Sequence, residues 1–318
     1  KRLARGAQAL SLGVIIAAAL PHDAAAVDAA TASPPASAVP QHPSPTATPT
    51  TPTTPPRQAR AGPGSDPDTT TYGRRDDLMR FGAQVAARHA LDEHTVQITL
   101  AQARFVRSIA QAVMPPPAGT VKNWAAYRAR FVEPRRIAAG VAFWLANEAW
   151  LTRAEQRYGV PPEIVVGIVG METLYGQHMG SYRVIDALAT LAFDFPTERK
   201  DRRAFFRDEL EQLLVQSLRA GNDPLALRGS YAGALGMPQF MPSSVNKYAV
   251  DFDGDGHIDL HTSTADVIGS VARYLADFGW QRGLPTHHEV LAPTDTRDRA
   301  LLLGPDILPS FTAQQFID

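Results

Sequence analysis

Apolar residues recur at helical spacing along most of the chain after residue 77, and this pattern limits the fold more than any other feature. Few segments show the alternation of apolar and polar residues that half-buried strands require. Pro134 suits the first turn of a helix and Gly159 suits a helix end. The sequence therefore predicts a mainly α fold, with helical patterns in 78–90, 99–114, 124–132, 134–160 and 162–176.

Residues 1–31 have the composition of an export signal. Three basic residues, Lys1, Arg2 and Arg5, precede an apolar stretch over 7–20, and small alanines follow it. The stretch is shorter than the roughly 20 residues that a membrane-spanning helix needs. We therefore predict a cleaved signal peptide and an exported, periplasmic protein, with an uncleaved N-terminal membrane anchor as the alternative.

Residues 32–74 are rich in Pro, Thr, Ser and Ala and have no periodic apolar face. Such a segment cannot bury enough apolar surface to offset the conformational entropy that folding removes. We predict a disordered linker over 32–74, followed by one folded domain over 75–318.

Composition excludes several classes of function. The net charge of -1 provides no overall electrostatic field for nucleic acid, so we expect no nucleic-acid partner. The absence of cysteine excludes disulfides, zinc sites with thiolate ligands and a cysteine nucleophile. The function must therefore come from other side chains.

Glu172 is the one carboxylate in the apolar run 165–176. Pro162 predicts the start of a helix and Gly176 its end, so Glu172 lies in the last turns of that helix. Burial and the negative end of the helix dipole both raise the pKa of a carboxyl group there, which suits a general acid. The alternative is a glutamate paired with an arginine from elsewhere in the fold. The helix face that carries Glu172 also carries four apolar residues, Ile164, Val165, Ile168 and Val169.

Further stretches resemble the B type of the exported lytic murein transglycosylases. They are 137–144, 158–164, 186–193 and 233–244, together with an E-T-x-x-G motif formed by Glu172, Thr173 and Gly176. The resemblance runs from about residue 78 to residue 318. It implies a lysozyme-like catalytic core with an N-terminal helical part, a single catalytic glutamate at position 172 and no organic cofactor.

In that family the glutamate protonates the glycosidic oxygen between N-acetylmuramic acid and N-acetylglucosamine. It then deprotonates the muramyl C6 hydroxyl, which attacks C1 and closes a 1,6-anhydro ring. The resemblance thus implies a monomeric enzyme acting on peptidoglycan strands, with other cell-wall enzymes as compatible partners. Two alternatives remain open: a non-catalytic wall-binding protein, and a muramidase that hydrolyses the same bond.

The C-terminal part is expected to be small and incomplete. The family carries an R-Y-N segment that returns to the cleft, and no such residues occur before Asp318. Residues 287–293 and 300–310 interrupt the helical pattern, and we expect short strands there, as part of a small α+β or β unit.

The resemblance also implies residues that bind substrate. Ser230, Gln239 and Phe240 match positions that line the cleft, whereas Tyr175 is either a platform for a sugar or a core aromatic. Arg202 and Arg203 match an arginine pair that meets the peptide stem of the glycan, although a charged run is more often a solvated surface. Two nearby carboxylates are expected to be structural: Asp186 and Asp194.

The segment 251–266 has the spacing of a calcium-binding loop. Positions one, three, five, six, seven and nine are held, in order, by Asp251, Asp253, Asp255, Gly256, His257 and Asp259. His257 would contribute its backbone carbonyl. Thr262 stands at position twelve in place of the usual glutamate, and Asp266 is the candidate that replaces it. A single loop of this kind predicts structural calcium and not a calcium sensor; a turn without metal is the alternative.

Overall fold

The structure is a computed structural model that describes residues 68–114, 123–287, 289, 291, 293–303, 311–312 and 314–315. The predicted signal peptide and residues 32–67 of the predicted linker lie outside this range. Within it, no helix is both long and apolar enough to span a bilayer.

Helices dominate the described part of the chain, which confirms the mainly α prediction. The helices are α1 (Asp76–His89), α2 (Glu93–Ala101), α3 (Arg107–Ala112), α4 (Trp124–Phe131), α5 (Pro134–Ala146), α6 (Glu148–Tyr158), α7 (Pro162–Thr173), α8 (Val184–Phe193), α9 (Arg203–Arg219), α10 (Pro242–Tyr248), α11 (Thr264–Asp277) and α12 (Thr296–Leu303). The short strands are β1 (Thr69–Thr71), β2 (Arg104–Val106), β3 (Tyr182–Arg183) and β4 (Arg228–Gly229). Both strand pairs, β1 with β2 and β3 with β4, are antiparallel.

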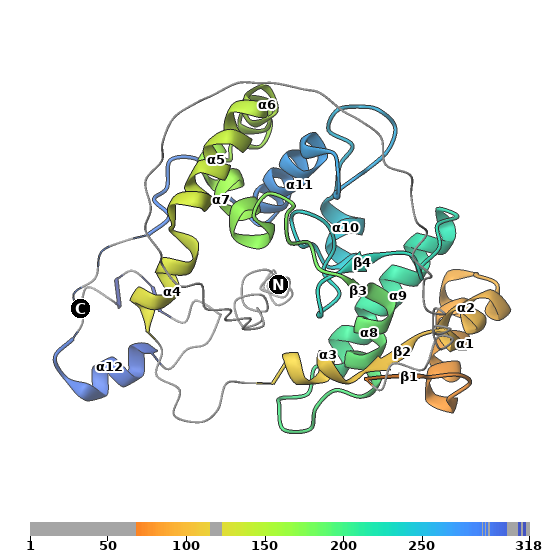
Figure 1. Cartoon of the computed structure of the whole chain (residues 1–318). Coiled ribbons are helices and arrows are strands. Elements are labelled where there is room, and N and C mark those ends of the chain that lie inside the picture. The colour runs from red at the N-terminus through yellow and green to blue at the C-terminus, as the bar shows by residue number, and fades with distance from the viewer. Residues whose placement is uncertain are drawn as a thin grey trace, which may run out of the picture.

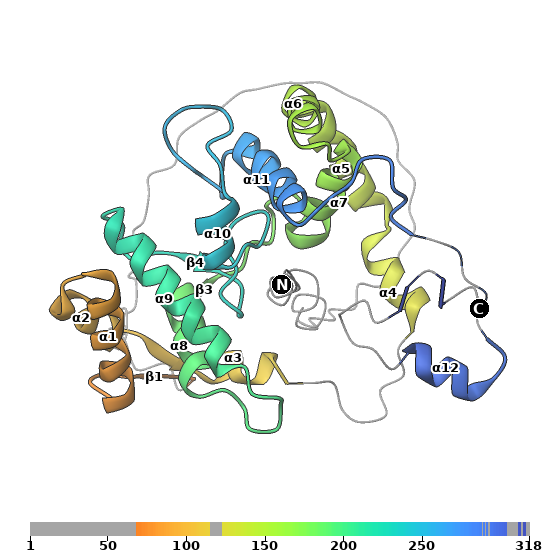
Figure 2. The ribbon, with the colours of Figure 1, turned by 180° about the vertical axis from the view of Figure 1, so that it is seen from behind.

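Two hydrophobic clusters organise these helices. The first cluster joins α1, α2 and α3 to α8 and α9, and every residue of α8 is buried. The second cluster joins α5, α6 and α7 to α10 and α11. Figure 1 shows α5, α6, α7 and α11 in one part of the molecule and α1, α2, α3, α8 and α9 in another, with α10 next to α9, and Figure 2 shows the same division from behind.

The segment 229–241 connects the two clusters. Leu235 belongs to the first cluster, whereas Met237 and Phe240 belong to the second. Leu235 forms isolated β-bridges with both Gly229 and Phe240. Because its side chains alternate between two separate cores, this segment is held on both sides.

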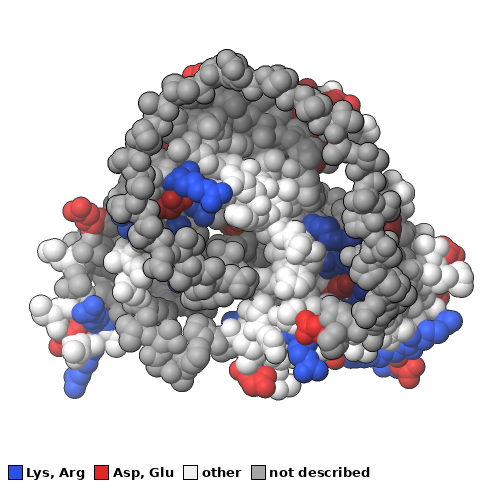
Figure 3. Space-filling view, in the orientation of Figure 1, with Lys and Arg blue, Asp and Glu red and all other residues white. Residues whose placement is uncertain are grey.

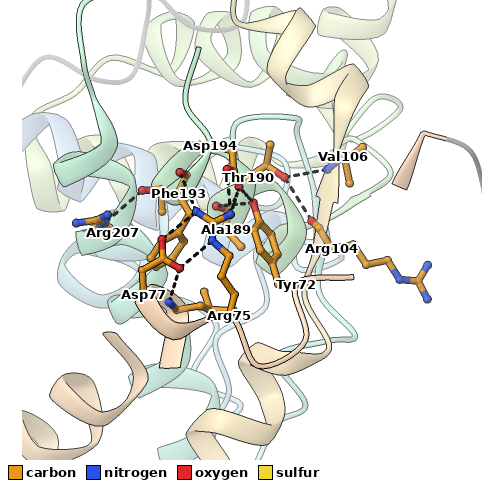
Figure 4. A network of polar contacts seen from close by, with 12 residues as sticks. Tyr72, Arg75, Asp77, Arg104, Val106, Ala189, Thr190, Phe193, Asp194 and Arg207 are labelled. Carbon is orange, nitrogen blue, oxygen red and sulfur yellow. Dashed lines mark hydrogen bonds and ion pairs between the residues drawn. The ribbon is translucent and has the colours of Figure 1, made fainter. Parts of the chain in front are cut away.

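A polar network attaches the N-terminal strand to the first cluster (Figure 4). The Tyr72 hydroxyl donates to Asp194, and the Arg75 guanidinium bonds both oxygens of Asp194 and also pairs with Asp77. Asp186 accepts the backbone N–H of Arg104 at 2.9 Å. Asp194 and Asp186 thus both have structural partners.

Two expectations from the sequence are wrong in this region. The folded part begins before residue 75, because Thr69–Thr71 pairs with β2 and Tyr72 is buried. The helical pattern over 99–114 is interrupted, because Arg104–Val106 forms strand β2. Strand pairing is a long-range interaction, and it overrides the local preference of both segments.

The C-terminal prediction also changes. Residues 300–303 belong to helix α12 and not to a strand, and the described residues after β4 contain no further strand. The side chain of Asp295 accepts the N–H of Arg297 at 2.6 Å, as a residue that initiates a helix does. This local signal starts the helix that includes residues 300–303, whereas residues 304–310 of the predicted strand region lie outside the described residues.

Candidate active site

Glu172 is the penultimate residue of α7. The buried face of this helix carries Val165, Val166, Val169, Gly170 and Thr173. Glu172 is partly buried and lies at the margin of that face, as do the partly buried Ile164 and Ile168. Of the four apolar residues predicted to share its face, two are therefore fully buried and two lie with the glutamate at the edge.

The carboxylate of Glu172 has no compensating partner. Its Oε2 atom is buried and makes no hydrogen bond, and no ion pair involves Glu172 in the described part of the chain. Burial alone raises the pKa of Glu172 from 4.5 to about 7. The structure thus favours the general-acid interpretation over pairing with an arginine.

The chain turns sharply after Glu172. Leu174 and Tyr175 have left-handed backbones, with φ of 50° and 57°, and Gly176 follows with φ of 86°. For a residue other than glycine this conformation costs about 1–2 kcal/mol. Thr173 stabilises the turn: its hydroxyl donates to the carbonyl of Met237 at 2.9 Å and accepts the N–H of Gly176 at 3.0 Å. Thr173 therefore connects the helix end to the segment 229–241.

The polar residues expected to bind sugar also organise this segment. The Ser230 hydroxyl accepts the N–H groups of Ala232 and Ala234, the latter at 3.0 Å. The side-chain amide of Gln239 donates to the carbonyls of Met179 and Gly236, at 3.2 and 2.8 Å. Both residues lie on the segment tied to α7, and their contact with a sugar remains a prediction.

The prediction for Phe240 is wrong. Its side chain has no exposed surface and packs in the second cluster, where its ring centroid lies 5.3 Å from that of Tyr274. A side chain without exposed surface cannot line a cleft. Phe240 anchors the segment 229–241 in the second cluster, whereas the side chain of the neighbouring Gln239 fixes the turn of this segment.

Tyr175 packs between helices. Its ring stacks on Phe143 of α5, with centroids 5.1 Å apart and planes at 30°. Burial raises the pKa of its hydroxyl, and the charge of Arg136 partly opposes this effect. Of the two interpretations that the sequence left open, the structure favours packing over a sugar platform.

Arg202 and Arg203 have different environments. Arg202 is half-buried, with its guanidinium 4.6 Å from the centre of the Phe205 ring, and burial lowers its pKa. Arg203 is exposed and pairs with Asp201 at 2.8 Å. Figure 3 shows basic side chains in separate groups on one face, with uncharged side chains between them. A role in binding stem peptides remains a prediction for both residues.

Three aspartates gather in the loop before α11. Asp251, Asp253 and Asp255 each offer an oxygen, and these atoms lie within 4.8 Å of one another. Gly254 and Gly256 have positive φ values of 84° and 91°, which shape the loop around them. Hard oxygen ligands in this arrangement fit a calcium ion.

The other residues predicted as ligands do not join that group. Asp259 accepts the N–H groups of His261 and Thr262. Asp266 is 1% exposed, and its two oxygens accept the N–H groups of Phe252 and Asp259, at 2.7 and 2.8 Å. Asp266 thus holds the loop 251–266 closed through these two hydrogen bonds. The exposed His257 remains a candidate through its backbone carbonyl.

Comparison with known proteins decides the family. Residues 73–308 match the family described as the transglycosylase SLT domain. The chain belongs to this family. It is 42% identical over 220 residues to the membrane-bound lytic murein transglycosylase B of Escherichia coli K12, a match that covers 67% of this chain and 60% of that protein. The chain therefore spans less than two thirds of the length of this curated relative.

Solved structures of the family have the same fold. Escherichia coli Slt35 in complex with calcium matches with 42% identity and a TM-score of 0.60, over 67% of each chain. Pseudomonas aeruginosa SltB3 in complex with NAG-anhNAM-pentapeptide matches with 33% identity and a TM-score of 0.59, over 69% of this chain and 56% of that one. The resemblance to B-type lytic transglycosylases and the lysozyme-like core are confirmed.

Sequence reasoning missed two residues of this site. In the sequence Thr173 stands only as part of the E-T-x-x-G motif, and its place directly after Glu172 is the signal that could identify it. Arg136 of α5 donates to the carbonyl of Gly170 near the end of α7, while its Nε atom is buried without a partner. No local pattern marks Arg136, because its contact depends on how the two helices cross.

Proposed function

We propose that this chain is a lytic transglycosylase that cleaves the β-1,4 bond between N-acetylmuramic acid and N-acetylglucosamine in peptidoglycan. The observation that carries the proposal is the carboxyl group of Glu172, which has no partner at Oε2 and a pKa of about 7. Such a group holds a proton at neutral pH and can also release it, as one residue acting as acid and then base must do.

Glu172 donates its proton to the glycosidic oxygen as the bond from that oxygen to C1 breaks. The muramyl C6 hydroxyl then attacks C1, and its proton passes to the Glu172 carboxylate, which restores the acid. The product carries a 1,6-anhydro ring and the reaction consumes no water. The anhydro sugar bound in the SltB3 structure supports this product for a related fold.

One carboxylate suffices for this scheme, whereas ordinary glycosidases use two. Asp186 is bound to the backbone of Arg104 and paired with Arg183 at 3.3 Å, and Asp194 is bound to Tyr72 and Arg75. Neither is available as a second catalytic group in the described structure. This supports a scheme in which neither aspartate assists Glu172.

Product analysis tests the proposal. Purified protein is incubated with polymeric peptidoglycan, and the soluble products are analysed by mass spectrometry, with Glu172→Gln as the control. We expect anhydromuropeptides that disappear in the control. Products heavier by one water would identify a muramidase, and binding without any product would identify a wall-binding protein.

The peptide stem is the proposed partner of Arg202 and Arg203 at the start of α9. Because Arg202 is half-buried on Phe205 and Arg203 already pairs with Asp201, Arg202 is the better placed to bind a carboxylate. We expect Arg202→Ala to lower activity on peptide-bearing strands and not on peptide-free glycan. Arg203→Ala is the matched comparison; equal losses on both substrates would indicate a structural role.

We also propose structural calcium, held by Asp251, Asp253 and Asp255 with the backbone carbonyl of His257. The closeness of the three carboxylates and the calcium complex of Slt35 support this assignment. A calcium ion would fix the loop next to α11 and take no part in the proton transfers.

We further propose that the protein acts on the periplasmic side of a membrane. The predicted export signal over residues 1–31 and the similarity to a membrane-bound relative support this proposal.

A further inference from the structure

Tyr175 occupies a space that two glycines create between α5 and α7. A Cβ atom built on Gly140 would lie 2.5 Å from the Tyr175 hydroxyl, and one built on Gly170 would lie 2.7 Å from its Cζ atom. Real Cβ atoms do not approach other atoms so closely. Gly140 and Gly170 therefore leave a space, here called the glycine slot, that the tyrosine ring fills.

The backbone conformation does not require glycine at either position of the slot. Both lie inside helices, where glycine is less favourable than alanine, and neither has a positive φ. Gly167, one turn earlier on α7, has no atom within 4 Å of the Cβ that an alanine would add. The difference between Gly167 and Gly170 shows that space for the ring is what Gly170 provides.

The ring acts on the turn that follows Glu172. Tyr175 has a left-handed backbone, which a residue other than glycine adopts only when its surroundings hold it there. The stacking on Phe143 and the filled slot are such surroundings, and Arg136 reaches the carbonyl of Gly170 at the same crossing of helices. The carboxylate itself has no hydrogen bond at Oε2, so its position depends on the backbone that carries it.

We propose that Tyr175 is a positioning residue for Glu172: its ring, held in the glycine slot, fixes the left-handed turn and thereby the place and the burial of the catalytic carboxylate. This inference rests on the proposed acid–base role of Glu172. It gives Tyr175 a function without contact with the sugar.

The first test compares two alanine variants on the same helix. Gly170→Ala places a methyl group against the ring, and we expect kcat to fall by about ten- to a hundredfold with little change in KM, because a misplacement of about 1 Å can cost that much. The loss of activity at high pH should also begin at a lower pH, since a displaced turn admits water to the carboxylate. Gly167→Ala should match the parent protein in all three respects.

The second test is a double-mutant cycle. Tyr175→Ala alone should lower kcat by a similar factor, and adding Gly170→Ala should cause no further loss, because the ring that the methyl group would strike is gone. Circular dichroism at the assay temperature checks that each variant is folded. If Gly170→Ala alone does not fold, the double variant, which lacks the clash, still gives the comparison with Tyr175→Ala.

The outcomes separate this inference from the function on which it rests. Any of three results would overturn the positioning role while Glu172→Gln stays inactive. They are a kcat of Gly170→Ala equal to that of the parent, losses that multiply in the double-mutant cycle, and a loss of activity at high pH that begins at the same pH as in the parent. If Glu172→Gln keeps its activity, the proposed function fails and the positioning role fails with it.

Discussion

The end of α7 and the loop between α10 and α11 both carry carboxylates, and the two regions treat them in opposite ways. At the end of α7, Glu172 has an oxygen with no hydrogen bond, and burial raises its pKa to about 7. In the loop, Asp251 accepts the N–H groups of Gly256, Gly254 and Asp255, which hold its pKa below the ordinary value.

The backbone explains the difference. At a helix C-terminus the free backbone groups are carbonyls, which cannot donate to a carboxylate, so Glu172 is left to the effect of burial. In a loop with two glycines of positive φ, successive N–H groups converge on one side chain. One environment favours the neutral acid needed for proton transfer, and the other favours the charged oxygens that a cation requires.

The largest expected effect removes the acid of the first region. Glu172→Gln keeps the size of the side chain but can neither donate nor accept the proton. General acid–base help is commonly about 10²- to 10⁴-fold, and one group serves both steps here, so kcat should fall by the upper value or more. Release of soluble muropeptides measures this loss. Activity within tenfold of the parent would exclude Glu172 as the catalytic group.

The pH dependence of the parent protein gives the next largest effect. The first step needs a protonated Glu172, so kcat/KM should fall about tenfold per pH unit above a pH near 7. An ordinary glutamate would place this limb near pH 4.5. Initial rates on soluble glycan fragments between pH 5 and 9 give the profile. A fall in kcat/KM that begins near pH 4.5 would show that burial does not set the pKa of Glu172.

Stability should depend on pH in a way that reveals the same burial. Below pH 4.5 the Glu172 carboxyl group is protonated in both the folded and the unfolded chain and costs nothing. Between 4.5 and about 7 only the unfolded chain loses the proton, so stability falls as pH rises, by roughly 3 kcal/mol in total. Glu172→Gln lacks this cost.

Denaturant unfolding of the parent and of Glu172→Gln measures the effect. The two proteins should be similar in stability near pH 4, and the variant should gain on the parent as the pH approaches 8. The difference should be flat above the folded-state pKa. A constant difference at all pH values would mean that the carboxyl group titrates alike in the folded and unfolded chains.

The sequence predicted those parts of the two regions that local spacing encodes. Glu172 follows from an apolar helix with one carboxylate and a glycine end, and the aspartate loop follows from three residues at alternate positions. Both signals lie within a single segment. The cause of the raised pKa could be predicted for the same reason, since a carboxyl group set in an apolar helix loses contact with water when that helix packs.

The remainder depends on contacts between segments distant in sequence. Phe240 and Gln239 are neighbours and both are buried, yet Phe240 packs in the second cluster whereas the amide of Gln239 bonds the backbone of Met179 and Gly236. Asp266 looks like a replacement ligand by spacing, but its place in the first turn of α11 directs both oxygens to the backbone of the loop. Tyr175 could not be assigned from its own neighbours, because the glycine slot needs a residue from α5.

The smallest expected effect concerns the second region and should appear as stability alone. Three carboxylates whose oxygens lie within 4.8 Å repel one another, and a calcium ion removes that repulsion. At a free calcium concentration a hundredfold above the dissociation constant, linkage gives about 2.7 kcal/mol, enough to raise the melting midpoint by several degrees. Magnesium should raise it less, since that ion demands a tighter octahedral geometry.

Variants of the loop separate ligands from residues that hold the loop closed. Asp251→Asn and Asp255→Asn should abolish most of the calcium-dependent shift, whereas Glu172→Gln should keep all of it. Asp266→Asn should lower the melting midpoint with and without calcium, because its oxygens hold the N–H groups of Phe252 and Asp259 in either state. If Asp266→Asn instead removes only the calcium-dependent shift, Asp266 is a ligand after all. If a chelator leaves the melting curve of verified calcium-loaded protein unchanged, the loop has no stabilising ion. The two regions then differ only in how far their carboxylates are buried.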